Sequence, residues 1–186
     1  MSQALVIDVA TGLLRGVRQV LSPHCDPRPS GSTLDLIVLH GISLPPGEFG
    51  GPWIEAFFCG NLPADGHPFF ASVRGLRVAA HFLIRRDGSI VQFVPCTLRA
   101  WHAGESQWAG RENCNDFSVG IELEGTDVAP YTDAQYPALS ALVQALLVAY
   151  PTLSRDRLAG HSDIAPGRKT DPGLSFDWQR LRQLLA

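Results

Sequence analysis

Three residues that are far apart in the chain, His40, His161 and Asp171, have side chains that commonly bind a catalytic metal ion. A catalytic zinc ion usually has three protein ligands and keeps a fourth position for water, and imidazole and carboxylate ligands suit it. Residue type alone is weak support, because a chain with six histidines contains many such trios. Asp163 lies between His161 and Asp171 in the same loop and is an equal candidate. The residues therefore allow a zinc site without defining its ligands.

Two carboxylates, Glu122 and Glu124, alternate with apolar residues in the segment 118–125. Residues two positions apart point to the same face of a β-strand, about 7 Å apart along it. A carboxylate beside a bound water can act as a general base and then as a general acid. The spacing does not distinguish the two glutamates, and a solvated strand face is the alternative interpretation.

Strands are predicted around these residues. The segment 34–40 is apolar from Leu36 to Leu39 and ends on His40, which is typical of a strand buried on both faces. Segments 78–84 and 90–94 flank an Asp-Gly pair, which predicts an antiparallel hairpin. The rigid end of a central strand is a suitable position for a functional histidine.

Helices are predicted from apolar residues at three- and four-residue spacing over about 133–149, and from Pro52 at the first turn of a short helix. Ser175 is expected to cap a last helix. The long irregular segment 60–70 is typical of a binding wall. The order of strands and helices predicts an α/β (α+β) fold, a central mixed β-sheet flanked by helices, in a single domain over 1–186.

Composition excludes several classes of protein. A net charge of −3 argues against binding to nucleic acid. Four widely spaced cysteines without a Cys-x-x-Cys pair argue against a thiolate zinc site and a disulfide framework. We find no apolar run long enough to span a membrane and no signal peptide, so we expect a cytoplasmic protein without an obligate protein partner.

Five segments carry a resemblance to a known family. They are Leu-His-Gly-Ile-Ser-Leu-Pro-Pro-Gly-Glu-Phe-Gly-Gly-Pro-Trp (39–53), Ala-His-Phe-Leu-Ile-Arg-Arg-Asp-Gly (80–88), Arg-Ala-Trp-His-Ala-Gly (99–104), Cys-Asn-Asp-Phe-Ser-Val-Gly-Ile-Glu-Leu-Glu-Gly-Thr-Asp (114–127) and Gly-His-Ser-Asp-Ile-Ala-Pro-Gly-Arg-Lys-Thr-Asp-Pro-Gly (160–173). In this order they resemble the zinc-dependent N-acetylmuramoyl-L-alanine amidases of the peptidoglycan-recognition and phage-lysozyme type, in particular the cytosolic branch that acts on anhydro-muropeptides. The resemblance runs from about Ser22 to the C-terminus.

The resemblance implies that one zinc ion is bound by His40, His161 and Asp171, and that Glu122 and Lys169 act on the substrate. Bound zinc lowers the pKa of water from 15.7 to about 7. Glu122 would then move the proton to the leaving amine, while Lys169 would stabilise the oxyanion. In the family an asparagine often follows the first histidine ligand, whereas this chain has a glycine there, Gly41.

The resemblance also implies a muropeptide substrate, hydrolysed at the amide bond between (1,6-anhydro-)N-acetylmuramic acid and L-alanine during cell-wall recycling. Such a reaction would control muropeptide-signalled β-lactamase induction. Arg77, Trp101, His102 and Trp108 are predicted to line the groove for sugar and peptide. The alternative for the aromatic residues is a small apolar cluster beneath a loop.

Two other functions compete with this prediction. One is a module that binds peptidoglycan without cleaving it, which is expected when a metal ligand is missing. The other is a non-haem iron oxygenase, because His161-Ser162-Asp163 forms half of a facial triad. Such enzymes take a second histidine from downstream, and no histidine follows His161. The amidase is the prediction that we carry forward.

Overall fold

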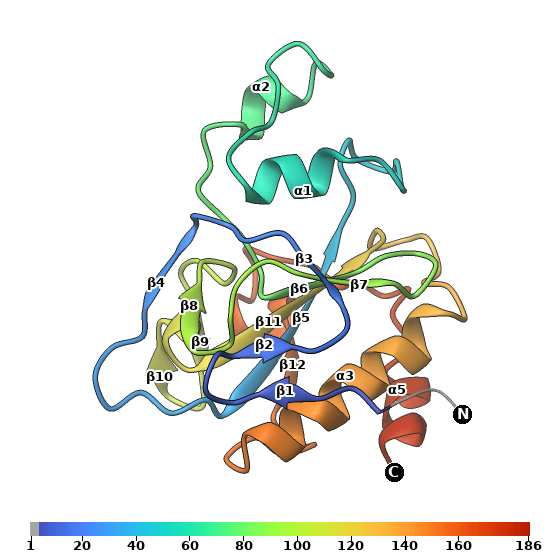
Figure 1. The fold of residues 1–186 in the computed structure, drawn as a ribbon. Helices are drawn as coiled ribbons and strands as arrows, with labels where there is room; N and C mark the ends of the chain where they lie inside the picture. The colour runs from blue at the N-terminus through green and yellow to red at the C-terminus, as the bar shows by residue number, and fades with distance from the viewer. Residues whose placement is uncertain (1–3) are drawn as a thin grey trace.

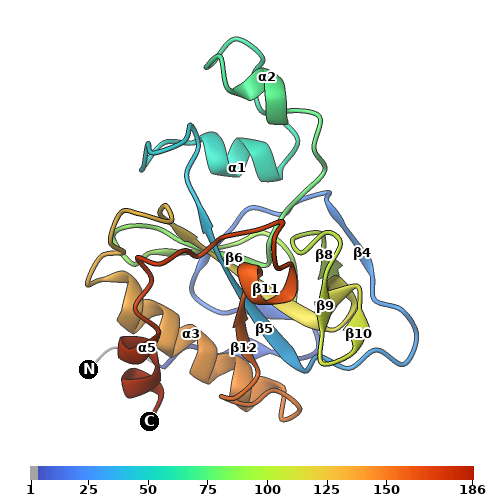
Figure 2. The same cartoon turned by 180° about the vertical axis from the view of Figure 1, so that it is seen from behind.

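The computed structural model describes residues 4–186, in which a six-stranded mixed β-sheet has helices on both sides (Figures 1 and 2). The strands in spatial order are β12 (Leu158–Gly160), β5 (Leu36–Ile42), β11 (Ser118–Glu124), β6 (Phe82–Ile84), β7 (Ile90–Gln92) and β3 (Arg18–Gln19). The first four strands run parallel to their neighbours, β6 and β7 form an antiparallel hairpin, and β3 runs parallel to β7. The predicted mixed sheet with flanking helices is therefore correct.

Shorter elements complete the described chain. The small strands are β1 (Ile7–Asp8), β2 (Leu13–Leu14), β4 (Cys25–Pro27), β8 (Leu98–Ala100), β9 (Gln107–Trp108) and β10 (Arg111–Glu112), which pair as β1–β2, β4–β8 and β9–β10. The helices are α1 (Trp53–Phe58), α2 (Phe70–Val73), α3 (Gln135–Ala149), α4 (His161–Ile164) and α5 (Trp178–Leu185), with a 3-10 turn at Cys114–Asp116. Within residues 4–186, no helix combines the length and the apolar character that crossing a bilayer requires.

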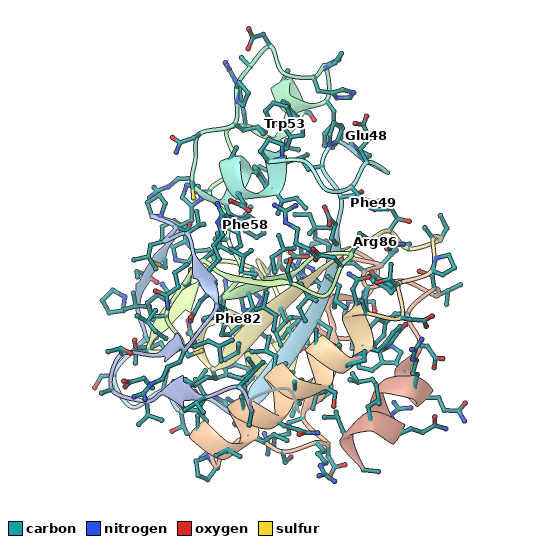
Figure 3. All side chains as sticks on the ribbon, turned by 45° about the vertical axis from the view of Figure 1, so that its right-hand side comes forward. Glu48, Phe49, Trp53, Phe58, Phe82 and Arg86 are labelled. Carbon is teal, nitrogen blue, oxygen red and sulfur yellow. The ribbon has the colours of Figure 1, made fainter. Side chains whose placement is uncertain are left out.

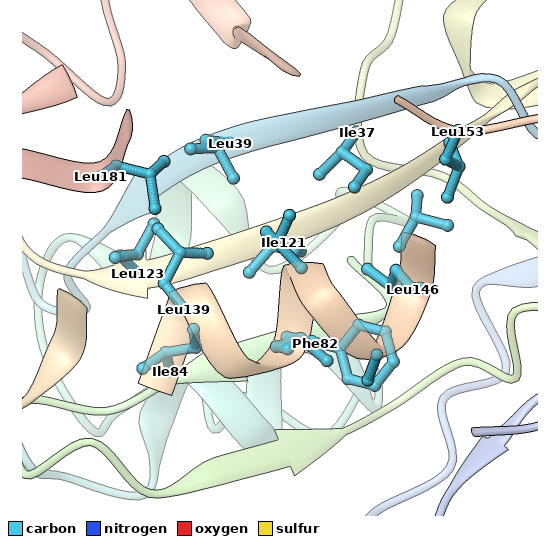
Figure 4. Close-up of a cluster of buried hydrophobic side chains, with 14 of the residues drawn as sticks. Ile37, Leu39, Phe82, Ile84, Ile121, Leu123, Leu139, Leu146, Leu153 and Leu181 are labelled. Atoms are coloured by element: carbon cyan, nitrogen blue, oxygen red, sulfur yellow. The ribbon is translucent and has the colours of Figure 1, made fainter. Parts of the chain in front are cut away.

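One face of the sheet packs on α3 and α5. Alternate strand residues such as Ile37, Leu39 and Ile121 are fully buried there against leucines of α3, as Figure 4 shows. Side chains at alternate positions of a strand point to opposite faces, so Leu36, Val38 and His40 lie on the other face. Both faces of β5 are covered, which explains why its sequence is continuously apolar.

The opposite face carries a separate unit made by α1, α2 and the irregular chain around them, which stands above the sheet in Figure 1. Its apolar side chains form their own buried cluster with Leu83, Val91 and Phe93 from the sheet. Phe58 packs edge-on against Phe93 with ring centroids 5.1 Å apart, and Figure 3 shows Phe58 between α1 and the sheet. The end of β5 therefore lies between this cluster and the cluster that joins the sheet to α3.

Two predicted boundaries are wrong. Ser175 does not cap the last helix; the Asp177 side chain accepts the Arg180 amide, and α5 begins at Trp178. The strand predicted over 78–84 begins only at Phe82. The amides of Ala79 and His81 are bonded to the carbonyls of Trp101 and Gly120, outside a regular strand ladder. An apolar pattern does not reveal which partner a backbone amide finds.

Candidate metal centre

The parallel strands β12, β5 and β11 bring the candidate ligands to one edge of the sheet. His40 lies near the end of β5, and His161 begins α4 directly after β12 ends at Gly160. Asp171 comes from the loop after α4, where its carbonyl oxygen accepts the Ser162 amide. Ligands of open α/β sheets typically bind beyond the carboxyl ends of parallel strands. This topology joins residues more than a hundred positions apart.

The three side chains point at one another. The Nδ1 atoms of His40 and His161 are 2.9 Å apart. Asp171 Oδ2 lies 3.1 Å from His161 Nδ1 and 3.3 Å from His40 Nδ1. Both imidazoles are buried, while the carboxylate is partly open to solvent. Three ligand atoms therefore surround a single point.

The hydrogen bonds behind the imidazoles define their protonation. His161 Nε2 lies 3.0 Å from the carbonyl oxygen of Ala103, so Nε2 carries the proton and donates it. His40 Nε2 lies 2.9 Å from His102 Nδ1. Burial lowers the pKa of His40 to about 4, so this imidazole is neutral at neutral pH. Because neutral imidazole has one protonated nitrogen, a proton on each Nε2 leaves both Nδ1 atoms with a free lone pair.

Two lone pairs and a carboxylate oxygen at these distances repel one another unless a cation lies between them. Burial raises the pKa of Asp171, but the neighbouring His161 and His40 side chains outweigh burial and hold this pKa well below its ordinary range. Asp171 therefore presents a negative charge to the point between the two imidazoles. Two histidines and one aspartate are also a donor set that suits a catalytic zinc. The residues present fit such a metal.

Glu122 lies beside this centre. It is the register partner of His40 on the neighbouring parallel strand, so both side chains rise from the same face of the sheet. Its Oε2 atom is shielded from solvent and has no hydrogen-bond partner. Burial raises the pKa of Glu122 well above its usual value, the Asp171 charge adds to this, and Lys169 opposes it. An unpartnered carboxyl group facing a metal centre is available for proton transfer.

Glu124 is the register partner of Ile42, further along the same strand face, but its carboxylate is fully engaged. It accepts the backbone amides of Gly50 (2.7 Å) and Arg86 (3.2 Å) and a hydrogen bond from the Arg85 guanidinium (3.2 Å). The residue is 1% exposed. Its bonds hold the chain before α1 against the sheet and engage both carboxylate oxygens, whereas Glu122 has none of these partners.

A cavity of about 270 Å³ opens above these residues. Its floor contains the three candidate ligands together with Glu122, His102 and Lys169. Its wall is apolar and comes from the unit above the sheet: Leu44, Phe57, Phe58, Phe69, Val73 and Leu76. A polar floor with potential catalytic groups and an apolar wall is typical of a small-molecule site.

A family model described as N-acetylmuramoyl-L-alanine amidase matches residues 30–174. The chain belongs to this family. It is 61% identical to the 1,6-anhydro-N-acetylmuramyl-L-alanine amidase AmpD of Escherichia coli K12 over 175 residues, which cover 94% of this chain and 95% of that protein. The AmpD of Haemophilus influenzae is 51% identical over 93% of this chain and 94% of that protein. The protein is therefore an N-acetylmuramoyl-L-alanine amidase.

Solved structures agree with the amidase fold. The crystal structure of a selenomethionine AmpD derivative superimposes with a TM-score of 0.93 at 57% sequence identity, covering 97% of this chain and 99% of that one. A complex of the amidase AmiD from E. coli with anhydro-N-acetylmuramic acid-L-Ala-D-γ-Glu-L-Lys has a TM-score of 0.60 at 28% identity, covering 97% of this chain and 65% of that one.

The predicted groove residues of this amidase lie in different places. The Arg77 guanidinium stacks over the Trp101 ring at 4.9 Å, and Trp101 Nε1 donates to Asp26 at 3.1 Å, so an exposed arginine lies on a half-buried tryptophan. His102 does line the cavity, although its ring contacts His40. Trp108 packs against the apolar cluster beneath its hairpin and does not line the cavity. Its packing supports the alternative interpretation of a small apolar cluster.

Two features of the amidase site were not predicted from the sequence. Half of the apolar wall comes from the short helices α1 and α2, through Phe57, Phe58 and Val73, and Phe69 is the wall residue within the segment 60–70 that was predicted to form a binding wall. Tyr131 is buried beside the floor, where its hydroxyl donates to the carbonyl of Pro172 at 2.9 Å. Burial raises the pKa of Tyr131, and the charge of Glu122 adds to this. No sequence pattern around Tyr131 indicates that position.

Proposed function

We propose that this amidase is zinc-dependent and hydrolyses the amide bond between 1,6-anhydro-N-acetylmuramic acid and the L-alanine of the stem peptide. The observation that carries the proposal is the floor of the cavity. Two imidazole lone pairs and the Asp171 carboxylate converge there beside an unpartnered Glu122. The choice of the anhydro-sugar rests on the similarity to AmpD proteins over nearly the whole chain.

His40, His161 and Asp171 would hold the zinc ion. When bound, zinc supplies Lewis-acid chemistry, lowering the pKa of water and polarising a carbonyl group. The hydrogen bonds at the two Nε2 atoms support this role because they leave Nδ1 of each imidazole free as a ligand. The neutral state of His40 at neutral pH removes competition from a proton on that residue.

Glu122 moves the proton in the proposed reaction. Its carboxylate takes a proton from the attacking water as the new C–O bond forms, and it then delivers this proton to the nitrogen of the leaving L-alanine as the C–N bond breaks. The raised pKa favours the second half of this transfer, because a weak acid holds the proton until the amine accepts it. The Lys169 ammonium lies at the cavity edge and stabilises negative charge on the carbonyl oxygen.

The cavity wall suits one end of a muropeptide. Leu44, Phe57 and Phe69 present apolar surface to a compact bicyclic sugar. The exposed Arg77, which lies over the Trp101 ring, offers a guanidinium to the carboxylates of the stem peptide. In the AmiD complex a protein of the same family holds an anhydro-muramyl tripeptide.

The proposed reaction places the protein in cell-wall recycling in the cytoplasm, where it would lower the anhydro-muropeptides that signal β-lactamase induction. Four unpaired cysteines are consistent with a reducing compartment. The substrate is then a small molecule, and the whole chain 1–186 acts as one catalytic domain without nucleic acid, membrane or an obligate protein partner.

Mass spectrometry of an anhydro-muramyl tripeptide before and after incubation tests the proposal. We expect release of a peptide that begins with L-alanine, loss of the reaction with a chelator, and recovery on adding zinc. Metal analysis should find about one zinc per chain, and Asp171→Ala should lose metal and activity together. Binding of the intact tripeptide without cleavage would instead favour a non-catalytic recognition module.

A further inference from the structure

The two imidazoles of the floor are held from behind by a single short stretch of chain. His102 contacts His40 through its side chain, and the next residue, Ala103, contacts His161 through its carbonyl oxygen. We propose that His102 is a positioning residue, which fixes His40 in the tautomer and ring orientation that present Nδ1 to the metal, as Ala103 does for His161. The inference rests on the proposed zinc site and concerns how the chain prepares its ligands.

The donor and acceptor in each hydrogen bond from Ser118 through His102 to His40 can be assigned by starting at Ser118. The Ser118 hydroxyl donates to the carbonyl oxygen of Cys114. Its oxygen is then free to accept, and His102 Nε2 lies 3.1 Å from it, so Nε2 of His102 carries a proton. A neutral imidazole with a proton on Nε2 has an acceptor at Nδ1. His40 Nε2 must therefore donate to it.

One face of the His102 ring is covered by the backbone of a neighbouring strand. The ring lies flat against Gly120 of β11, where a Cβ would come within 2.5 Å of His102 Cγ. The ring stands nearly perpendicular to that of His40, at 84°, with centroids 5.0 Å apart. This is the geometry in which one ring nitrogen donates toward the edge of the other ring. Gly120 is thus required as the space in which the positioning ring fits.

The backbone of His102 and Ala103 is also held by hydrogen bonds. Asn115 Oδ1 accepts the amide of His102 at 3.1 Å and that of Ala103 at 2.8 Å. The Arg168 guanidinium also donates to the Ala103 carbonyl at 2.7 Å, so this oxygen serves both His161 and Arg168. Hydrogen bonds from one short segment therefore fix the groups behind both histidine ligands. Hydrogen-bond partners behind metal ligands commonly contribute 10- to 100-fold in metal affinity.

Zinc affinity, measured by competition with a chromophoric chelator, tests the inference. We expect His102→Ala to weaken zinc binding by about 10- to 100-fold. His102→Asn should recover most of the loss, because its Oδ1 can accept from His40 near the place of Nδ1. Ser118→Ala, which removes the group that orients the proton on His102, should show a smaller loss. The visible absorption of the cobalt-substituted protein should shift in His102→Ala and return in His102→Asn.

His81→Asn is the matched control. His81 is as buried as any residue of the floor and lies near His102, but its partners are the Gly120 amide, the Leu98 carbonyl and the Arg28 guanidinium instead of a metal ligand. This variant should lose stability while its folded form keeps zinc affinity. Unchanged affinity in His102→Ala, or an asparagine no better than alanine, would overturn the inference and leave the proposed function standing. An unaltered protein that fails to bind zinc would overturn both.

Discussion

Gly41 follows the candidate ligand His40, and the space of its missing side chain is filled by Tyr131. A Cβ built on Gly41 would overlap the Tyr131 hydroxyl oxygen, whereas the ring carbon Cζ would remain 3.6 Å away. The same hydroxyl donates to the carbonyl of Pro172, directly after Asp171. We therefore expect Gly41→Ala to displace the Tyr131 hydroxyl and to disturb the loop that carries Asp171.

The cost follows from how the overlap is relieved. If the ring keeps its place, overpacking costs about 1–3 kcal/mol. If the hydroxyl moves, the Pro172 carbonyl loses a partner, which costs about 1–3 kcal/mol. Either way the free energy of unfolding falls by about 1–3 kcal/mol, and the melting temperature of a chain of this length falls by about 2–4 °C per kcal/mol.

A double-mutant cycle isolates the overlap. Tyr131→Phe removes the hydroxyl and leaves the ring at an ordinary contact distance, so Gly41→Ala should cost little in that background. Urea unfolding of the four proteins in the presence of chelator would give the coupling energy, which we expect at about 1–3 kcal/mol. Additive effects of the two substitutions would refute the reasoning. Zinc affinity of Gly41→Ala should fall as well and recover in the double variant.

Two further predictions concern the glutamates. Glu122→Gln should abolish turnover and keep zinc. Its metal-free form should be more stable at pH 7 by about 1–3 kcal/mol, because the substitution removes a buried carboxyl group whose pKa is raised by folding. Because the pKa of Glu122 is higher in the folded protein than in the unfolded chain, the unaltered protein loses stability as the pH rises from the ordinary value of 4.5 to the folded pKa. The extra stability of Glu122→Gln should therefore vanish below pH 4.5. Urea unfolding that shows the same extra stability at every pH would contradict this prediction. Glu124→Ala should lower stability by about 1–3 kcal/mol, because the backbone amides of Gly50 and Arg86 lose their acceptor while Arg85 keeps its ion pair with Glu55. Zinc content should stay unchanged and affinity for substrate should fall. Selective loss of the chemical step in a folded Glu124→Ala would exchange the roles of the two glutamates.

The elements predicted correctly from the sequence are those whose pattern of apolar residues reflects which of their own faces are buried. The run Leu36 to Leu39 is apolar because both faces of β5 are covered, and α3 repeats apolar residues because one face packs on the sheet. The Asp-Gly turn predicted the β6–β7 hairpin for a local reason, since its geometry is set by four residues. Such features need no knowledge of distant partners.

The roles within the site depend on partners that the sequence does not display. Glu122 and Glu124 share one strand face and look alike in sequence. What separates them is that Glu124 meets Arg85 and two backbone amides while Glu122 meets none. His102 was expected to contact substrate, and its ring also stands behind His40. The cap of the last helix was predicted at Ser175 and lies at Asp177, because tertiary hydrogen bonds of the residues before Trp178 keep them out of the helix.

The cavity wall belongs to an apolar cluster of its own, apart from the one that joins the sheet to α3. Its helices α1 and α2 have six and four residues, so they open locally at lower cost than the 15-residue α3. Amide hydrogens of the wall should therefore exchange with solvent sooner than those of β5 and α3, and a bound muropeptide should slow them. Evolution can also alter the wall, and with it the accepted sugar, while the metal-binding edge of the sheet stays intact.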